Sequence, residues 1–518
     1  MYPGTLQPIL PRDTIEARRW EHTRLRRRLL EGTWEMDLVE RLEVHLGTVR
    51  RQAWGWPDMS SNVYRQICRE LAALYVLPPD VSHPTRGQFA EGLVGPDGVI
   101  ARSGLWATMS RYQALVIGCR EYWQRVHVTA DGRVTYRPVP PDMTVAKASE
   151  DRPDYPVRIQ ELRPRWHEGR NAYCWTWDVL SIEDPAYPVY EVREAKLGGE
   201  LGEDMTAMYL GGTFSGDAYP YRRNDGRPIL PYVLYHAERI GDRLFDAWEG
   251  REVVEGSLNL AVMFSMLFHA MKDASWPQRY AVGARPVGAG VAGDAAGSRM
   301  EVIADPATVL LMEAESEQQP VIGQWQPAAD VEKMEQTIAA VANRLAQDAG
   351  VSPADIQRMG GTARSGYAIA LSSEAKRDCQ RKYAQSFRAS DEQLVMTTAI
   401  LLNRATGTTY PEGGYSVAYR SIPLSGQELE ARRKHALELM EAGLMTRIDA
   451  MRLLDDSLTE QDAVAKLLEI DAMTRRLVDE DASDPMVPAD TRVNPAMETD
   501  GESEDETDPE TGEAAIAD

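Results

Sequence analysis

The sequence contains few cysteines, and the spacings through which cysteines bind metal or perform redox chemistry are absent. Only Cys68, Cys119, Cys174 and Cys379 occur among the 518 residues, and none belongs to a C-x-x-C pair. This spacing argues against a zinc knuckle, a redox dithiol and a disulfide-stapled fold. It favours a reducing compartment.

Basic residues are scarce relative to acidic ones. The chain has 57 Lys and Arg against 80 Asp and Glu, a formal net charge of −23, which argues against a surface that holds DNA phosphates tightly. Residues 479–518 contain fifteen acidic residues and one basic residue, Arg492, so their net charge is −14 and that of residues 1–478 is −9. The acidic segment, poor in large apolar side chains, is predicted to be disordered.

Signals for export and for membrane insertion are not expected in this sequence. The arginine-rich segment 18–30 has no apolar stretch after it; we interpret it as a solvated amphipathic helix, with a transit peptide as the alternative. The most apolar run, Leu258 to Phe268, is shorter than the about 20 residues that a membrane span needs. We therefore expect no membrane partner.

The sequence motifs of common enzymes are missing as well. It contains no G-x-x-x-x-G-K-[S/T], H-E-x-x-H or G-x-S-x-G. Residues 288–293 match G-x-G-x-x-G, but Arg285-Pro286 precedes them and no helix opens after them, so a flexible loop is the better interpretation. An enzyme hidden in the middle of the chain would need a polar constellation within residues 125–240, and none is evident. We predict no catalytic residue, no cofactor and no metal.

What the sequence does contain is a definite order of helical and strand-rich segments. Residues 13–78 and 106–121 have helical periodicity, and Pro78-Pro79 is expected to stop the helix that begins near Asn62. Residues 125–240 alternate apolar and polar side chains, with a hairpin around Asp131-Gly132 and strands near 155–163, 172–182, 187–194 and 230–236. The predicted fold class is α+β, mainly helical.

Two helices of similar length enclose an irregular segment further along the chain. Residues 257–276 and 328–349 lack proline and glycine, with Asp330 as the expected N-cap of the second helix and Gly350 as its end. The first helix is apolar nearly all round, so it must be covered on most sides. Neighbouring copies of the chain would supply that cover; burial inside one domain is the alternative. The predicted packing residues are Leu260, Phe264, Leu267, Phe268, Val331, Met334, Ile338, Val341 and Leu345.

The last third of the chain is predicted to be helical. A glycine-containing loop, 350–365, leads into a helix from Tyr367 to Thr406, which Ser372-Ser373 could kink, and a strand is expected at 415–421. Three further helices within 425–478 each begin at a capping-box pattern, starting at Ser425, Thr446 and Thr459.

This order of parts resembles the portal proteins, or head–tail connectors, of tailed double-stranded DNA bacteriophages. Four short segments within residues 60–478 are similar to the family's sequences: Arg133–Met143, Gly226–Val233, Asp348–Pro353 followed by Ser365–Ala368, and Ala442–Thr446. The first 50 residues and the acidic segment have no such similarity.

The resemblance implies a division of the chain into the parts of a portal protomer. These are a basic helical arm (1–50), a wing (51–252 and 366–425), a stem of two helices (253–276 and 328–349), a clip (277–327), a tunnel loop (350–365), a crown (426–478) and the acidic tail (479–518). In the tunnel loop, Gly360-Gly361 would allow a sharp corner. The residues expected to line the DNA channel are Arg358, Met359, Gly360, Gly361, Thr362 and Arg364.

The resemblance also implies the function and the partners. The family forms a ring, usually of twelve subunits, at one vertex of the capsid in the virion, after assembly in the host cytoplasm; double-stranded DNA is packaged and ejected through it. Terminase, a head-completion or adaptor protein and the major capsid protein are the expected partners, with scaffold protein as a further candidate. The ring itself catalyses nothing. The alternative is another structural virion protein, a minor capsid or tail component without a DNA channel.

Overall fold

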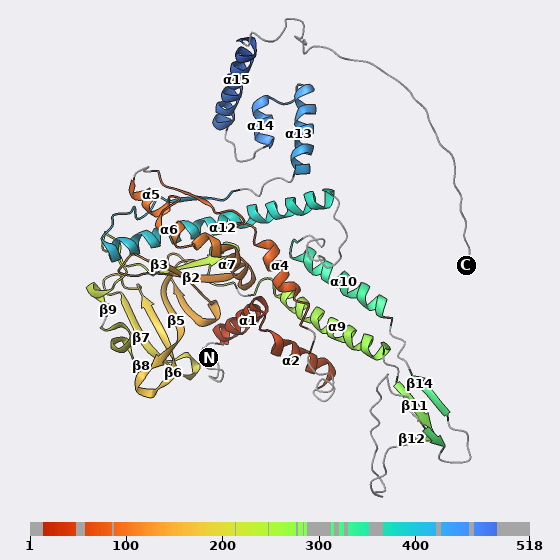
Figure 1. Cartoon of the computed structure of the whole chain (residues 1–518). Helices are drawn as coiled ribbons and strands as arrows, with labels where there is room; N and C mark the ends of the chain where they lie inside the picture. The colour runs from red at the N-terminus through yellow and green to blue at the C-terminus, as the bar shows by residue number, and fades with distance from the viewer. Residues whose placement is uncertain are drawn as a thin grey trace, which may run out of the picture. The chain divides into compact units, whose positions relative to one another are not determined.

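The computed structural model describes residues 14–47, 57, 59–84, 88–212, 214–246, 248–275, 278–282, 284–286, 312–314, 321–325, 330–351, 366–420, 426–454 and 460–483. They form mixed helices and sheets, which confirms the α+β class (Figure 1). The chain divides into two compact units, residues 1–431 and 432–518.

Helices and two groups of strands build the first unit. Its α-helices are α1 (Thr14–Glu31), α2 (Glu35–Leu46), α4 (Val63–Leu71), α5 (Gln88–Val94), α6 (Val99–Arg102), α7 (Leu105–Cys119), α8 (Thr206–Leu210), α9 (Arg251–Ser275), α10 (Val331–Asp348) and α12 (Gly366–Thr406). Short 3-10 turns lie at Pro141–Met143 (η1), Glu168–Arg170 (η2), Leu197–Gly199 (η3) and Gly216–Ala218 (η4).

A three-stranded and a six-stranded antiparallel sheet lie next to these helices. The smaller has the order β10-β2-β3, with β2 (Glu121–Val128), β3 (Val134–Val139) and β10 (Tyr232–His236). The larger has the order β4-β5-β6-β7-β8, with β9 paired to β7. Its strands are β4 (Thr144–Ala148), β5 (Pro156–His167), β6 (Ala172–Ser181), β7 (Val189–Ala195), β8 (Leu201–Asp204) and β9 (Phe214–Ser215). The predicted strands and the hairpin at Asp131-Gly132 are confirmed.

Helix α1 contradicts the interpretation of the arginine-rich segment as a solvated helix. Trp20 is fully buried, and Arg19 and Arg26 are nearly so. The Arg19 guanidinium donates to the backbone carbonyls of Pro141 and Thr144, and the Trp20 indole N–H also donates to Thr144 O. Arg19 is therefore buried because it satisfies main-chain acceptors of the strand-rich region, and Arg26 because it donates to the carbonyls of Gly118 and Glu249. The charge pattern alone could not reveal these contacts.

Helix α4 is shorter than predicted. It ends at Leu71 rather than at the prolines, because Ala72 leaves the helical conformation with φ −79° and ψ 69°. The amide of Leu74 then finds a side-chain acceptor, Gln113 Oε1 in α7. A tertiary hydrogen bond thus replaces the last helical turn.

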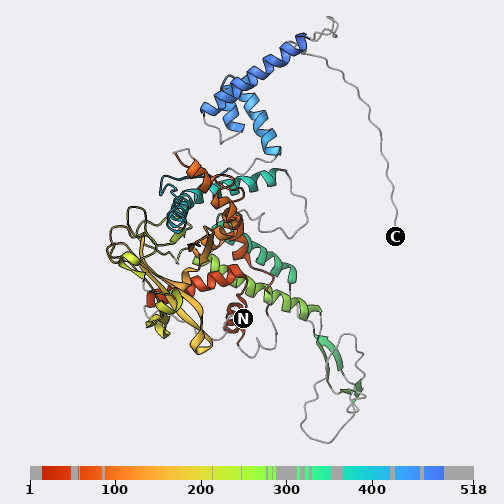
Figure 2. The same cartoon turned by 60° about the vertical axis from the view of Figure 1, so that its left-hand side comes forward.

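Helix α12 is a single helix of 41 residues that runs through Ser372-Ser373 without a break. It lies along the three-stranded sheet (Figure 2). Ser386 Oγ donates to His236 O, and Ser390 Oγ donates to Leu234 O, both in β10. Sequence-distant β1 (Asp80–Ser82) and β15 (Ser416–Ala418) pair beside it, so the strand expected at 415–421 is confirmed in part.

A buried carboxylate anchors the same helix. Asp391 is fully buried and accepts hydrogen bonds from the hydroxyls of Tyr75, Tyr235 and Tyr419, at 2.8, 2.7 and 2.6 Å. Burial raises the pKa of Asp391 to about 6, against the lowering effect of the three phenol donors. One helix is thereby tied to three distant segments of the unit.

The C-terminal unit is helical, as expected, and consists of α13 (Gly426–Glu441), which begins just before it, α14 (Arg447–Leu454) and α15 (Glu460–Ser483). The capping box at α14 is confirmed: Thr446 Oγ1 accepts from the Asp449 amide, and Asp449 Oδ2 accepts from the Thr446 amide. The expected caps Ser425 and Thr459 lie outside the described residues. Helix α15 extends to Ser483, five residues past the expected limit, and residues 484–518 lie outside the described part.

Candidate functional site

Helices α9 and α10 form the pair that the sequence predicted, and they lie side by side (Figure 1). Both are close to their expected bounds, although α9 starts at Arg251, earlier than predicted, and runs through Gly256. The Asp330 side chain caps α10 by accepting the Lys333 amide at 3.0 Å, as expected. Gly350 follows α10 with a φ of 73°, which a glycine adopts without strain.

The two helices come close to each other at Gly256. A Cβ atom on this residue would lie 2.3 Å from Leu345 Cδ2 of α10. Leu345 and Ile338 are buried in this contact, whereas Val331, Met334 and Val341 are partly buried against the core. The predicted seam of α10 therefore contacts its own chain, and a glycine in α9 makes the close approach possible.

The first half of α9 is covered within one chain. Leu258, Leu260 and Val262 are buried, and α9 contacts α2, α4 and α10. The expectation that neighbouring copies cover α9 does not hold for this half, where the alternative, burial within one chain, is observed. The apolar pattern did not show that α2 and α4 fold onto it. Of the other packing residues, Leu267 is buried and Phe264 is partly buried.

The second half of α9 leaves apolar side chains at the surface. Phe268 is 60% exposed and Met271 is 48% exposed. An apolar groove between α9 and α10 is lined by Met263, Met266, Asp330, Lys333, Met334, Thr337 and Ile338. We call Phe268 and Met271 the distal apolar surface; by helical periodicity, Phe268 lies on the side of α9 away from this groove. Of the predicted packing residues, Phe268 lies on this surface, whereas Met334 and Ile338 line the groove and are partly buried and buried, respectively.

By length and composition, residues Arg251–Lys272 of α9 could cross a membrane, so the estimate based on the run Leu258 to Phe268 was too short. Half of the segment is buried inside the protein. A core helix of a soluble protein meets the same criterion, so this finding does not indicate a membrane.

Two short antiparallel ribbons lie between α9 and α10 in the chain. β11 (Gln278–Val282) pairs with β14 (Val321–Trp325), and β12 (Ala284–Pro286) pairs with β13 (Met312–Ala314). The irregular segment expected at 277–327 thus has paired strands in its described parts. The G-x-G-x-x-G match and all six predicted channel residues (Arg358, Met359, Gly360, Gly361, Thr362 and Arg364) lie outside the described residues.

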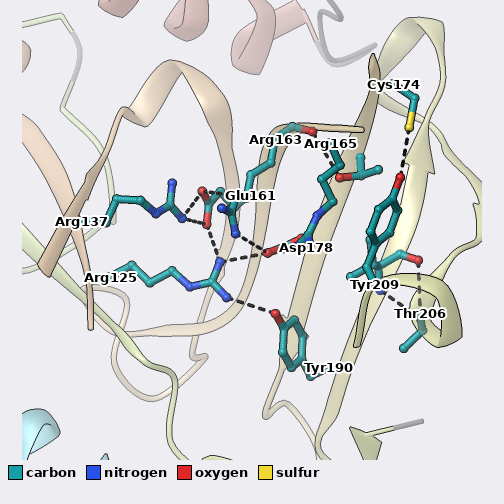
Figure 3. A network of polar contacts seen from close by, with 12 residues as sticks. Arg125, Arg137, Glu161, Arg163, Arg165, Cys174, Asp178, Tyr190, Thr206 and Tyr209 are labelled. Atoms are coloured by element: carbon teal, nitrogen blue, oxygen red, sulfur yellow. Dashed lines mark hydrogen bonds and ion pairs between the residues drawn. The ribbon is translucent and has the colours of Figure 1, made fainter. Parts of the chain in front are cut away.

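The strand-rich region contains a polar constellation that sequence reasoning missed. Arg125 on β2 lies opposite Arg137 on β3, and Glu161 on β5 lies opposite Asp178 on β6. Like charges directly opposite each other on a sheet are unfavourable. Here the two pairs face each other across the junction of the sheets, so each cancels the repulsion within the other (Figure 3).

The distances in this network are those of hydrogen-bonded ion pairs. Arg125 Nη1 donates to Glu161 Oε2 and to Asp178 Oδ2, both at 2.9 Å. Arg137 Nη2 donates to both Glu161 oxygens at 2.5 and 2.7 Å. Arg165 Nη2 donates to Asp178 Oδ1 at 2.6 Å, and Arg163 Nη1 lies 3.3 Å from Asp178 Oδ2.

Tyrosine hydroxyls complete the hydrogen bonding of the network. Arg125 Nη2 donates to Tyr190 Oη, and Tyr232 Oη donates to Glu161 Oε2. Burial by itself would raise the pKa of Asp178, but Arg125 and the other two arginines outweigh it and lower that pKa. Asp178 is therefore ionised and paired at neutral pH, an arrangement that suits structure rather than proton transfer.

One signal for this network was present in the sequence. Glu161, Arg163 and Arg165 alternate along β5, which places them on one face of the strand. Nothing local indicated that Asp178 and Arg125 would meet that face, because their pairing depends on how the two sheets join. Within the described residues, no group of three His, Cys, Asp or Glu side chains is placed to hold a metal ion.

Comparisons with known proteins give no close relative. No family model matches the chain, and no curated protein matches it. Two similar solved structures are the "Virion of native gene transfer agent (GTA) particle" and the "Neck of empty GTA particle computed with C6 symmetry". The first is 13% identical with a TM-score of 0.36 and covers 76% of this chain and 90% of the other. The second is 12% identical with a TM-score of 0.36 and covers 79% and 93%.

Proposed function

We propose that the chain is a structural protein of a phage-like virion and, more specifically, a portal protein. One observation carries the proposal. Helices α9 and α10 pack against each other, the paired ribbons lie between them in the sequence, and the long helix α12 follows. This is the order of stem, clip and wing helix that the sequence resemblance implies. The protein would act by forming a channel and would catalyse no reaction.

The distal apolar surface supports self-association. Phe268 and Met271 are large apolar side chains exposed on α9, a helix whose apolar segment is half buried in its own chain. Burying them against a neighbouring copy would remove apolar area from water at about 25 cal/mol per Å². The chain carries a net charge of −23, so copies repel one another and salt should favour assembly by screening.

The proposed partners follow from the proposal that the chain is a portal protein. Double-stranded DNA would pass through the ring, and an acidic protein would let it slide because strong phosphate contacts would slow it. Terminase, an adaptor protein and the capsid would meet the ring at one vertex of the virion, and scaffold protein remains a further candidate. Arg358 and Arg364 of the 350–365 loop would make transient phosphate contacts in the channel.

Negative-stain electron microscopy and light scattering of the purified full chain test this proposal. Closed rings that form without ATP or metal are expected, and Phe268→Asp combined with Met271→Asp should reduce them strongly. Leu197→Asp, which changes an equally exposed apolar residue outside the helix pair, is the matched control. A 58 kDa monomer at every concentration and salt would refute the proposal and favour a minor capsid or tail component.

A packaging assay separates the portal from other ring-forming virion proteins. Arg358→Ala with Arg364→Ala should leave ring assembly unchanged and alter the amount or retention of packaged DNA. Unchanged packaging in rate, amount and retention would count against the channel role of this loop.

A further inference from the structure

The network in the strand-rich region carries more positive than negative charge. Arg125, Arg137, Arg163 and Arg165 contribute four positive charges, and Glu161 and Asp178 contribute two negative ones. A partly buried excess of charge is unfavourable unless a counter-charge is close. The excess of two positive charges is notable in a protein whose net charge is −23.

The unused donors of this network are at the surface. Both carboxylates are buried, whereas the side chains of Arg137 and Arg163 are 40% and 33% exposed. Arg137 uses only Nη2 in its hydrogen bonds to Glu161, and Arg163 uses only Nη1 toward Asp178. Arg163 Nε also lies 3.7 Å from Glu161 Oε1. The other N–H groups of the two guanidiniums make no hydrogen bond to the described part of the chain, and they can donate to an added oxyanion.

A third nitrogen donor lies beside the two arginines. His127 is exposed on β2, two residues beyond Arg125 and therefore on the same face of the strand. Partial burial, and then the charges of Arg125, Arg163 and Arg137, lower the pKa of His127. Its imidazole thus lies within the positive field of the cluster and is neutral at pH 7. We call Arg137, Arg163 and His127 the arginine surface.

We propose that the arginine surface binds carboxylate side chains of the C-terminal segment 484–518 supplied by a second copy of the chain. This segment holds twelve Asp and Glu residues and one basic residue, Arg492, so its charge complements the surface. Arginine matches the planar carboxylate with two parallel hydrogen bonds. Thirty-five residues span up to about 120 Å when extended, which is enough to reach a neighbouring molecule.

An acidic peptide fits this surface better than duplex DNA does. The guanidinium groups are recessed, since more than half of each side chain is buried against Glu161 and Asp178. A single carboxylate on a two- or three-atom stem can reach such a group, whereas a duplex presents phosphates on a stiff surface. The net charge of −9 over residues 1–478 also repels a polyphosphate.

Fluorescence anisotropy with a labelled synthetic peptide of residues 484–518 tests the proposal. The receptor is the full-length chain in which the twelve acidic residues of its own segment are replaced by Asn and Gln. Saturable binding is expected, weakened at least tenfold by Arg137→Gln with Arg163→Gln and weakened further as NaCl is raised from 50 to 300 mM. Arg227→Gln, at an arginine of which 80% is exposed outside this network, should bind the peptide normally.

A single variant and a control peptide complete the experiment. Arg137→Gln alone should weaken binding several-fold, and it provides the answer if the double variant does not fold. A control peptide of residues 484–518 in which Asn and Gln replace the twelve Asp and Glu residues should not bind. Equal binding to the wild-type and variant surfaces, or no binding at all, would overturn the proposal, as would arginine-dependent binding of a duplex oligonucleotide in place of the peptide.

Discussion

The strand-rich region and the α9/α10 pair differ in which kind of side chain they bury and which they expose. The strand-rich region buries the carboxylates of Glu161 and Asp178 and pairs both with arginines of the same chain. The helix pair is built from apolar side chains, yet its distal half leaves Phe268 and Met271 in solvent. Buried charge must be paired within the fold because an unpaired buried charge destabilises the folded state. Exposed apolar area, in contrast, can be buried later by association with another molecule. We infer that the first region stabilises the protomer and that the second is available for assembly.

The largest effect is expected from Arg125→Met, which leaves both buried carboxylates with fewer donors. The free energy of unfolding should fall by about 3–5 kcal/mol, which is the cost of removing one partner of a buried ion pair. Urea unfolding followed by fluorescence of the buried Trp123 and Trp177 measures it. Arg170→Met, at an exposed ion pair with Glu194, is the control and should have no measurable effect. A small loss in Arg125→Met would mean that the network contributes little.

The buried carboxylates Asp391 and Glu121 should stabilise the first unit as the pH falls from 7 to 5, and His236, whose pKa burial lowers to about 4, should oppose part of this gain. Burial raises the pKa of Asp391 to about 6 and that of Glu121 to about 7. A raised folded-state pKa means that the folded state binds more protons, so this contribution is full below pH 4 and is lost as pH rises through 6 to 7. For Asp391 the loss amounts to about 3 kcal/mol, because each pKa unit corresponds to about 1.4 kcal/mol.

Unfolding free energies measured from pH 4.5 to 7.5 check this dependence. Asp391→Asn should flatten the curve, while Asp225→Asn in an exposed loop should reproduce the wild-type curve. The same slope in Asp391→Asn as in the wild type would assign the pH dependence to other groups. Below pH 4 the trend reverses, because Asp178, whose pKa is lowered by its arginines, then gains a proton and loses its ion pairs.

A moderate effect is expected at the close approach of α9 and α10. Gly256→Ala places a methyl group 2.3 Å from Leu345 Cδ2, and relieving such overpacking costs about 1–3 kcal/mol. Adding Leu345→Ala should recover part of this loss in a double-mutant cycle, although the truncation leaves a cavity of its own. Strictly additive losses would show that Gly256 and Leu345 do not interact.

The smallest effect is expected at the start of α10. Asp330→Ala removes the side-chain acceptor of the Lys333 amide and should cost about 1 kcal/mol. Asp330→Asn should restore most of it, because asparagine caps equally well. Equal losses in both variants would point to the charge of Asp330 rather than to its cap.

The sequence allowed prediction wherever a local pattern decides the structure. The α9/α10 pair, the cap at Asp330, the hairpin at Asp131-Gly132 and the capping box at Thr446 all follow from patterns a few residues long. Long-range contacts escaped prediction. The buried state of Arg19 and Arg26, the cover of α9 by α2 and α4, and the meeting of Arg125 with Asp178 each depend on segments far apart in the chain.

The two serine contacts of α12 have a consequence for the assembly proposed above. β10 is an edge strand, and edge strands with free carbonyls invite intermolecular strand addition and aggregation. Ser386 and Ser390 occupy the outward carbonyls of His236 and Leu234. In the proposed ring, these contacts oppose strand addition between copies at this edge, so that association would rest on side chains, which can specify geometry and a closed number of subunits.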